Sequence, residues 1–283
     1  LPVFERLAFD PVFGHMLYGL IMVVASVTVF AKDEFRILRE QFPAFPLDKF
    51  AVFGFETFPV RTPSASRGEH MYRLVLCLHL AHAVRSKRYR SETGEYPAEE
   101  TMAVFWRESE VELLDRGTFW LSEVPDSVSK GWDAYCNRTC TWGLFRCRAS
   151  GQRFYFFNTH LDHIGKTARA ESLKLIAARI GGINTKETPV ILTADFNSRT
   201  TDVCFAPLHA CMADARAEAP LTDDKPSWNG YGRKSAPNWL DHIFFAGKGC
   251  RAIEFRTLTG DYGAPPYISD HYPVAAWFRC SND

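Results

Sequence analysis

The chain has 283 residues, and 46% of them are hydrophobic, which provides enough apolar surface for a sizeable core and excludes a wholly disordered protein. Its 33 basic and 33 acidic residues give a formal net charge of zero, so no overall positive field attracts nucleic acid or a membrane surface. No internal period points to a repeat, coiled-coil or collagen protein. Any binding of phosphate groups must therefore come from a local site.

Eight cysteines are spread through the chain, and no two of them have the Cys-x-x-Cys spacing of a zinc ribbon. A chain of this length can bury enough apolar surface to fold without covalent cross-links. We therefore expect reduced thiols that bind no metal. A disulfide framework is the alternative, and it would place the protein in a secretory compartment.

Residues 17–31 (LYGLIMVVASVTVFA) form an apolar run of fifteen residues. A membrane-spanning helix needs roughly 20 apolar residues, and a secretory signal has a basic segment before its apolar part, which this sequence lacks. The run is therefore predicted to be a buried strand or helix, and the protein to be cytoplasmic. A secretion signal or a membrane anchor at this run is the alternative.

The segments that follow the apolar run carry weaker signals. Several prolines within 41–65 disfavour a long helix there, whereas 71–84 (MYRLVLCLHLAHAV) is apolar nearly all round and predicts a buried helix. The basic hexamer at 85–90 (RSKRYR) is interpreted as a solvated face, with a phosphate-steering patch as the alternative.

The C-terminal two thirds of the chain alternates predicted strands with loops. Apolar residues at helical spacing predict a helix over 166–180, which Gly181 and Gly182 should end. The alternation continues without a long linker, so we expect one domain over 1–283. β-Branched and aromatic runs predict strands at residues 102–107, 141–148, 153–158, 189–194, 240–246 and 272–278.

Polar side chains gather at the ends of four of these strands. One Asp or His at a strand end is usually a turn or capping residue, but four clusters of the same oxygen-and-imidazole type are hard to explain in that way. Because the clusters contain no thiolate, they suit a hard ion such as Mg²⁺ or Mn²⁺ rather than structural zinc. The clusters are Asn158-Thr159-His160-Leu161-Asp162, Asp195-Phe196-Asn197, Leu240-Asp241-His242 and Ser269-Asp270-His271.

Phosphoester hydrolysis uses this set of chemical groups. A metal ion neutralises phosphate charge, an imidazole oriented by a carboxylate activates water, and further His and Asn donors hold the non-bridging oxygens. No Ser or Cys stands in an obvious nucleophile setting, so direct attack by water is the simpler mechanism. The residue chemistry therefore predicts a metal-dependent hydrolase.

The order of the clusters along the chain is also informative. Asn-Thr-His-Leu-Asp (158–162), Thr-Ala-Asp-Phe-Asn (193–197), Leu-Asp-His-Ile-Phe (240–244) and Ser-Asp-His-Tyr-Pro (269–273) together resemble the endonuclease/exonuclease/phosphatase superfamily, the DNase I-like hydrolases. Segments 117–123 (GTFWLSE), 130–134 (KGWDA) and 226–230 (PSWNG) resemble a mostly bacterial branch of that superfamily.

This resemblance covers about residues 94–279, and residues 1–90 are expected to be a divergent part of the same domain. It implies an α/β fold, a four-layer sandwich in which two packed, largely antiparallel β-sheets are flanked by helices.

The resemblance implies roles for the residues of the four clusters. His271 would be the general base, and Asp241 would be the carboxylate that orients it. Asp195 would position the attacking water or a metal ion, and Asn197 would donate to the phosphate. His160 would stabilise the pentavalent phosphate.

Neighbouring positions are implied to bind the substrate. Asn158 and Asp162 would fix the loop around the phosphate, with the Asn158 amide counted as substrate-binding. Trp228 and Asn229 stand in the aromatic-Asn-Gly loop that lies at the cleft in this branch.

The resemblance implies Asp270 and Glu100 as metal ligands. Glu100 stands where the branch has a glutamate before a strand, and Glu99 or Glu95 could be the equivalent instead. Family members also begin with a strand that ends in a metal-site Asn, followed by a Gln-Glu pair whose Glu binds the metal. No Asn occurs before position 137, and Glu40 is the nearest candidate for the glutamate ligand.

The expected cofactor is Mg²⁺ or Mn²⁺. The expected partner is a phosphorylated small molecule, lipid head group or nucleic acid, bound by a monomer that needs no protein partner. Two interpretations stay open. One is a Mg²⁺-dependent phosphoesterase, and the other is a catalytically impaired homologue that binds a phosphorylated ligand or a partner, favoured by the missing N-terminal ligands.

Overall fold

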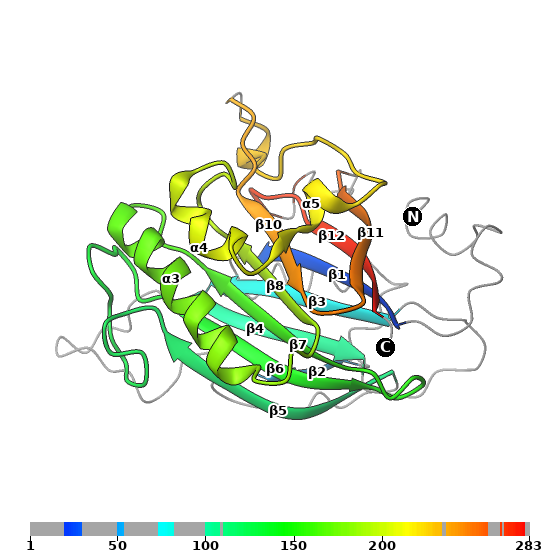
Figure 1. Cartoon of the computed structure of the whole chain (residues 1–283). Helices are drawn as coiled ribbons and strands as arrows, with labels where there is room; N and C mark the ends of the chain where they lie inside the picture. Colours follow the sequence, from blue (N-terminus) through cyan, green and yellow to red (C-terminus); the bar gives the residue numbers. More distant parts are fainter. Residues whose placement is uncertain are drawn as a thin grey trace, which may run out of the picture.

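Two mixed β-sheets of six strands each pack face to face (Figure 1). The structure is a computed structural model, and it describes the strand segments 20–29, 50–53, 73–81 and 100–107 together with residues 110–233, 236–259, 267 and 269–280. The first sheet has the order β11-β12-β1-β3-β4-β2 and the second the order β5-β6-β7-β8-β10-β9. In each sheet one pair is parallel, β1 with β3 and β7 with β8, and the remaining pairs are antiparallel.

The bounds of the strands follow from these ladders. The first sheet consists of β1 (Leu20–Val29), β2 (Phe50–Phe53), β3 (Arg73–Ala81), β4 (Glu100–Arg107), β11 (Cys250–Thr257) and β12 (Val274–Cys280). The second sheet consists of β5 (Val111–Trp120), β6 (Thr139–Cys147), β7 (Arg153–His160), β8 (Val190–Asp195), β9 (Ala213–Asp214) and β10 (Asp241–Ala246).

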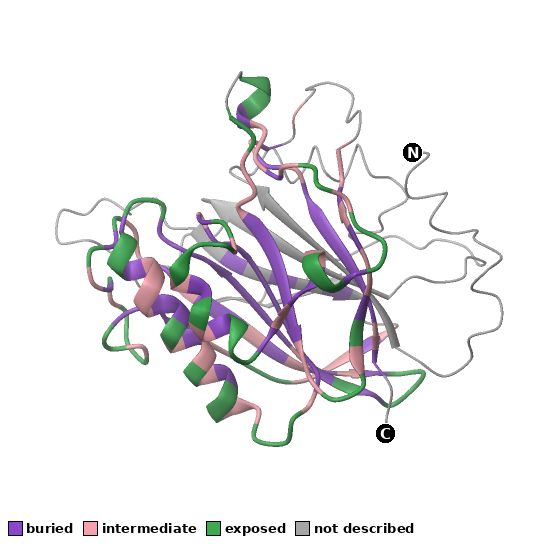
Figure 2. Cartoon of the chain, turned by 45° about the horizontal axis from the view of Figure 1, so that its top comes forward, coloured by how far each residue is buried: buried purple, intermediate pink, exposed green. Residues whose placement is uncertain are grey.

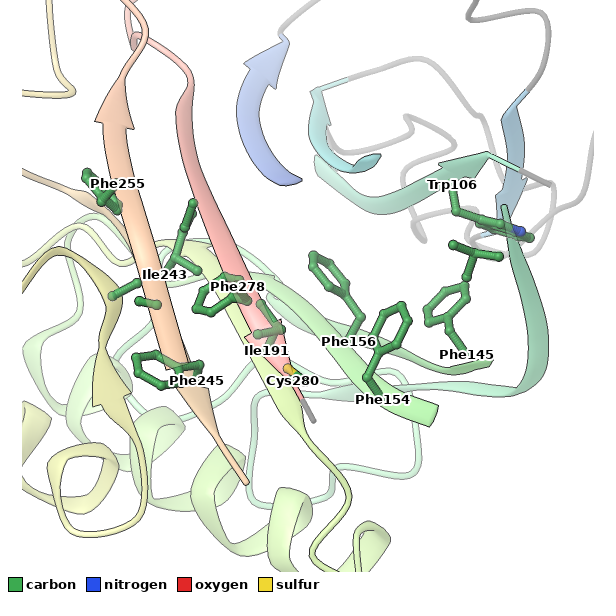
Figure 3. Packing of buried hydrophobic residues seen from close by; sticks show 14 of the residues in the cluster. Trp106, Phe145, Phe154, Phe156, Ile191, Ile243, Phe245, Phe255, Phe278 and Cys280 are labelled. Carbon is green, nitrogen blue, oxygen red and sulfur yellow. The ribbon is translucent and has the colours of Figure 1, made fainter. Parts of the chain in front are cut away.

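Aromatic side chains fill the space between the two sheets (Figure 3). The Trp106 and Phe145 rings, from opposite sheets, meet edge to face with centroids 5.5 Å apart. Burying one such side chain stabilises the folded state by about 1.5–3 kcal/mol. This core therefore fixes the positions of the two sheets relative to each other. Its labelled members are Trp106, Phe145, Phe154, Phe156, Ile191, Ile243, Phe245, Phe255, Phe278 and Cys280.

Helices cover the other face of the second sheet. They are α3 (Lys166–Ile183), the short turn η3 (Val203–Phe205) and α4 (Ala206–His209). Successive strand residues point to opposite faces, so Phe156 enters the core between the sheets while Phe157 packs under α3 with Ile176. In Figure 2 the inward side of α3 is buried and its outward side exposed.

The predicted fold class, two packed and largely antiparallel sheets flanked by helices, is confirmed. None of the described helices lies on the outer face of the first sheet, so the fourth layer stays a prediction.

The apolar run at 17–31 contains β1, which lies between β12 and β3. Its backbone pairs with β12 from Leu20 and with β3 as far as Val29. The strand alternative of the prediction is therefore confirmed. None of the described helices is long and apolar enough to cross a membrane.

The helix predicted over 71–84 is wrong, because this segment contains β3, with β1 and β4 as its neighbours in the sheet. A strand inside a sheet can be apolar at every position, and such a run cannot be told from a buried helix by periodicity. The basic hexamer at 85–90 lies outside the described residues.

Besides the short strands β2 and β9, two long strands, β5 and β11, were not predicted. Both form edges of their sheets, and both contain a register shift, between Leu113 and Asp115 and between Ala252 and Glu254. Edge strands tolerate charged residues and bulges, which interrupt the alternation that reveals a strand in a sequence.

Helix α3 continues through both glycines that were expected to end it. A side chain at Gly181 or Gly182 would face open space, so packing does not require the helix to end at either glycine. The helix ends instead at Asn184, whose N–H donates to Ile180 O and whose side chain pairs with the backbone of Thr188.

Cys250 and Cys280 form a disulfide, so the prediction of reduced thiols is wrong for this pair. They lie directly opposite each other in β11 and β12, with Cα atoms 4.0 Å apart. That proximity depends on strand register, which the spacing of cysteines in the sequence does not reveal. The other cysteines with described side chains form no disulfide: Cys136, Cys140, Cys147, Cys204 and Cys211.

Candidate active site

Strand register brings three of the polar clusters to one edge of the second sheet. The parallel pair β7 and β8 places His160 opposite Asp195, and the antiparallel pair β8 and β10 places Asp195 opposite Asp241. The ends of β7 and β8 and the start of β10 therefore meet at the same place (Figure 1). The fourth cluster arrives from the first sheet, because His271 lies just before β12.

His271 and Asp241 form a buried hydrogen-bonded pair. The imidazole Nδ1 donates to Asp241 Oδ2 over 2.6 Å, and both side chains are almost fully buried. This bond leaves Nε2 of His271 pointing to Asp195, whose Oδ2 is 3.7 Å away. The carboxylate of Asp241 therefore fixes both the tautomer and the orientation of the ring.

The charge state of His271 is set by opposing effects. Burial disfavours the imidazolium, but the negative charges of Asp241 and Asp195, with a smaller contribution from Asp270, raise the pKa of His271 to about 10. Burial is also the main cause that raises the pKa of Asp270, with His271 acting in the opposite direction. Negative charge is thus concentrated around one imidazole.

Asp195 lies next to both His160 and His271. Its Oδ2 is 3.3 Å from Nε2 of His160, and its Oδ1 accepts the backbone N–H of Asn197 over 2.8 Å. Asn197 has a left-handed backbone with φ of 48°, which Asn adopts more readily than most residues. Its Nδ2 donates to Leu161 O and lies 3.0 Å from Nε2 of His160.

Asn158, on β7, and Asp162, just after it, flank His160 in the sequence and bond to neighbouring segments. Asn158 has no exposed surface, and its Oδ1 accepts the hydroxyl of Thr193 on the neighbouring strand. The carboxylate of Asp162 accepts four backbone N–H groups, those of Tyr135, Cys136, Ile164 and Gly165. Burial opposes ionisation of Asp162, yet these donors lower its pKa to about 2.

The loop with Trp228 and Asn229 lies against the His271 segment. Trp228 forms a β-bridge with His271, and the N–H groups of Asn229 and Gly230 both donate to Asp270 O. The Asn229 side chain bonds to both segments, because its Nδ2 donates to Ser269 O near His271 and its Oδ1 accepts the N–H of Tyr231 in its own loop.

Glu100 begins β4, and its backbone lies at the same edge of the first sheet as the start of β12. Glu100 pairs with Ala81 at the end of β3, and β3 runs parallel to β1, whose Ser26 pairs with Val274. The side chain of Glu100 and the whole of Glu40 lie outside the described residues.

Two residues of this region were given no role by the sequence analysis. Arg138 is buried, with Nη2 3.3 Å from Nδ1 of His163 and Nε 3.7 Å from Asp162 Oδ2. Ser227 is fully buried behind Asp241, although it lies inside a segment that the sequence analysis singled out. Neither has a local sequence signal, since each depends on contacts with distant segments.

No family model matches the amino-acid sequence, and no curated protein matches it significantly. Solved structures are similar in fold. An endonuclease/exonuclease/phosphatase family protein from Bacteroides thetaiotaomicron is 23% identical, with a TM-score of 0.70 over 94% of this chain and 100% of that chain. A mannosyl-6-phosphatase from the same species is 25% identical, with a TM-score of 0.66 over 91% of this chain and 99% of that chain.

A more distant similarity is to D. rerio TDP2 complexed with a single-strand DNA product, which is 15% identical, with a TM-score of 0.61 over 91% of this chain and 98% of that chain. The resemblance carried by the four sequence motifs is thus confirmed at the level of the fold, and the chain has the fold of the endonuclease/exonuclease/phosphatase superfamily.

Proposed function

We propose that this chain is a phosphoesterase, in which a water molecule attacks the phosphorus of a phosphate ester, the ester P–O bond breaks and the alcohol leaves. The observation that carries the proposal is the geometry of His271, held by Asp241 through a 2.6 Å hydrogen bond at Nδ1. An imidazole with one nitrogen bound to a buried carboxylate can take a proton at its other nitrogen, and the carboxylate stabilises the imidazolium that results.

Asp195 provides the place for the attacking water. Its carboxylate lies next to Nε2 of both His271 and His160, at 3.7 and 3.3 Å. A water molecule bound to this carboxylate is within reach of His271 Nε2, the atom that removes its proton. His160 and Asn197, which adjoin on the other side of Asp195, donate to the phosphate oxygens as negative charge develops on them.

The donor set suits a hard divalent cation. Carboxylates of three aspartates surround one imidazole, and burial raises the pKa of Asp270, so a cation beside this carboxyl group would favour its charged form. Asp270 would hold the ion together with Glu100, whose backbone lies at the same edge. A bound Mg²⁺ or Mn²⁺ would neutralise phosphate charge and offset the negative field that keeps His271 protonated.

The names of the structural neighbours point to phosphate esters of more than one size. One neighbour is a mannosyl-6-phosphatase, and another carries a single-strand DNA product. The net charge of zero gives this chain no general attraction for a polyanion, which favours a small phosphate ester over non-specific cleavage of nucleic acid.

The test is hydrolysis by the purified chain of a panel of sugar phosphates, nucleotides, lipid head groups and short oligonucleotides, with Mg²⁺, with Mn²⁺ and with a chelator. We expect release of phosphate or alcohol that requires the cation and is abolished by His271→Gln. His209→Gln is the matched control, because this imidazole is exposed on α4 and should leave turnover unchanged. Hydrolysis that survives His271→Gln, or no hydrolysis of any ester, would contradict the proposal.

A further inference from the structure

Ser227 lies where the two sheets meet behind the His271–Asp241 pair. Its side chain is fully buried, and its Oγ accepts two backbone N–H groups, those of Leu240 and Asp241, each over 3.1 Å. Its carbonyl oxygen accepts the N–H of Tyr272 over 2.6 Å. One residue is therefore bonded to the backbone on both sides of the pair, next to Asp241 and next to His271.

This double attachment matters because Asp241 and His271 belong to different sheets. Asp241 begins β10 of the second sheet, and His271 precedes β12 of the first. The ladder of either sheet fixes the position of one partner only. The distance between the carboxylate and the imidazole therefore depends on what joins the two segments at this edge.

The strand pairing explains why a serine hydroxyl is needed at this point. On one side, β10 pairs with β8 from Asp241 onward, and Leu240 O accepts the N–H of Phe196. On the other side, β9 has only two residues and pairs only with Phe244 and Phe245. None of the described strands lies along that side of the start of β10, and Ser227 Oγ supplies the acceptor that a strand would provide.

We infer that Ser227 is a positioning residue that sets the geometry of the His271–Asp241 pair from outside it. Its hydroxyl oxygen holds the backbone of Asp241, while its carbonyl holds the backbone that follows His271. The adjoining residue Trp228 reinforces this link through its β-bridge with His271. The effect on turnover rests on the proposed phosphoesterase function, whereas the effect on the pair itself does not.

The first test compares Ser227→Ala with Ser227→Thr. The alanine variant removes the acceptor and lets the start of β10 shift, so kcat should fall by about 10- to 100-fold, since misplacement by about 1 Å has effects of that size. KM should change little, because Ser227 contacts no substrate. Ser227→Thr keeps the hydroxyl and should recover most of kcat. If the added methyl group of threonine prevents folding, Ser227→Cys takes the place of Ser227→Thr in this test.

A double-mutant cycle with Asp241→Asn separates positioning from a general loss of stability. If Ser227 acts through the carboxylate of Asp241, Ser227→Ala should have little further effect on kcat once that carboxylate is gone. Ser172→Ala is the matched control, because Ser172 is a buried serine on α3, remote from the pair in the sequence, and its loss should leave kcat unchanged. Equal fold-losses of kcat in both backgrounds would overturn the inference.

A readout without substrate keeps this test independent of the proposed function. The proton on His271 Nδ1, in a short bond to a carboxylate, should give a far-downfield NMR signal that Asp241→Asn removes. Ser227→Ala should move or broaden this signal, and Ser227→Thr should restore it. An unchanged signal in Ser227→Ala overturns the positioning role. An inactive wild-type chain whose signal responds as described would contradict the proposed function alone.

Discussion

Two carboxylate–imidazole clusters lie within the part of the chain that the structure describes, and their surroundings give them different properties. In each of them, Cys136–Asp162–His163 and Asp195–Asp241–His271, the side-chain oxygen, nitrogen or sulfur atoms lie within 4.8 Å of one another. By distance alone, each could be a metal site. The partners of the carboxylates distinguish them.

Asp162 is surrounded by donors that cannot move or titrate. Four backbone N–H groups occupy its two oxygens, and the guanidinium of Arg138 lies beside it. Its pKa falls to about 2, and its lone pairs are committed to holding two loops together. Such a carboxylate is an anchor with little left to offer a metal ion.

Asp195, Asp241 and Asp270 have ionisable partners instead. Their charges meet at the single imidazole of His271 and raise its pKa to about 10. Charges that shift one another's proton affinity are typical of sites that transfer protons or bind cations. The same residue types thus differ in proton affinity according to whether backbone or titratable groups surround them.

We expect Asp241→Asn to have the largest effect, a loss of turnover. The amide keeps the shape, but it loses the charge that stabilises the imidazolium and can hold the wrong tautomer of His271. Turnover of a phosphoester should fall by roughly 10²–10⁴-fold with little change in KM. Measuring kcat and the melting temperature on the same preparation tests this.

If Asp241 were only a turn residue beside Trp239, the variant would lose about 1 kcal/mol of stability and keep its turnover. Asp126→Asn is the matched control, because Asp126 is an exposed carboxylate paired with Arg179, and neither kcat nor stability should change measurably.

The next largest effect belongs to Asp162→Asn, and it should appear in stability. The amide retains one acceptor oxygen and turns its NH₂ group toward backbone N–H groups that then lack an acceptor. Hydrogen bonds to a charged group contribute about 1.5–3 kcal/mol each, so a loss of about 3 kcal/mol in the free energy of unfolding is expected. Urea unfolding at neutral pH measures it, and a loss below about 1 kcal/mol would remove the anchoring role.

Asp162 and Asp241 also show how much of the site could be predicted from the sequence. The motifs that contain Asp162, Asp195, Asp241 and His271 are each contiguous, so pattern and order were enough to find them and to predict the fold class. What separates Asp162 from the others is contact with Tyr135 and Cys136, some 26 residues away. Partners set by tertiary folding leave no local pattern.

The same limit explains the parts of the prediction that failed or were missed. The helix predicted over 71–84 is strand β3, since a run that is apolar throughout fits either element until its neighbours are known. Ser227 was noticed within a motif, but its bonds to Leu240 and Tyr272 depend on how the sheets meet. The disulfide between Cys250 and Cys280 depends on strand register.

Addition of Mg²⁺ should distinguish the two clusters by a smaller effect. A ligand that binds only the folded state stabilises it by about 2.7 kcal/mol at 100 times its dissociation constant, so the melting temperature of the wild-type chain should rise with Mg²⁺. Asp270→Asn should abolish the rise, and His163→Gln should leave it intact. A rise that depends on His163 would instead place the ion at the Asp162 cluster.

The smallest expected effect is the response of the Asp162 anchor to acid. The pKa of Asp162 is about 2 in the folded chain, below the value of about 3.9 that is usual for an unfolded Asp. The unfolded chain therefore takes up the proton first as the pH falls, and the stabilisation by Asp162 is complete above about pH 4 and lost between about pH 4 and pH 2. A depression of nearly two pKa units corresponds to at most about 2.6 kcal/mol. Other carboxylates also titrate in this window, so the quantity to measure is the difference in unfolding free energy between the wild-type chain and Asp162→Asn. That difference should be constant from pH 7 to pH 5 and shrink toward pH 2.5. If this difference in unfolding free energy stays the same from pH 7 to pH 2.5, the stabilisation by the hydrogen bonds at Asp162 does not depend on its charge.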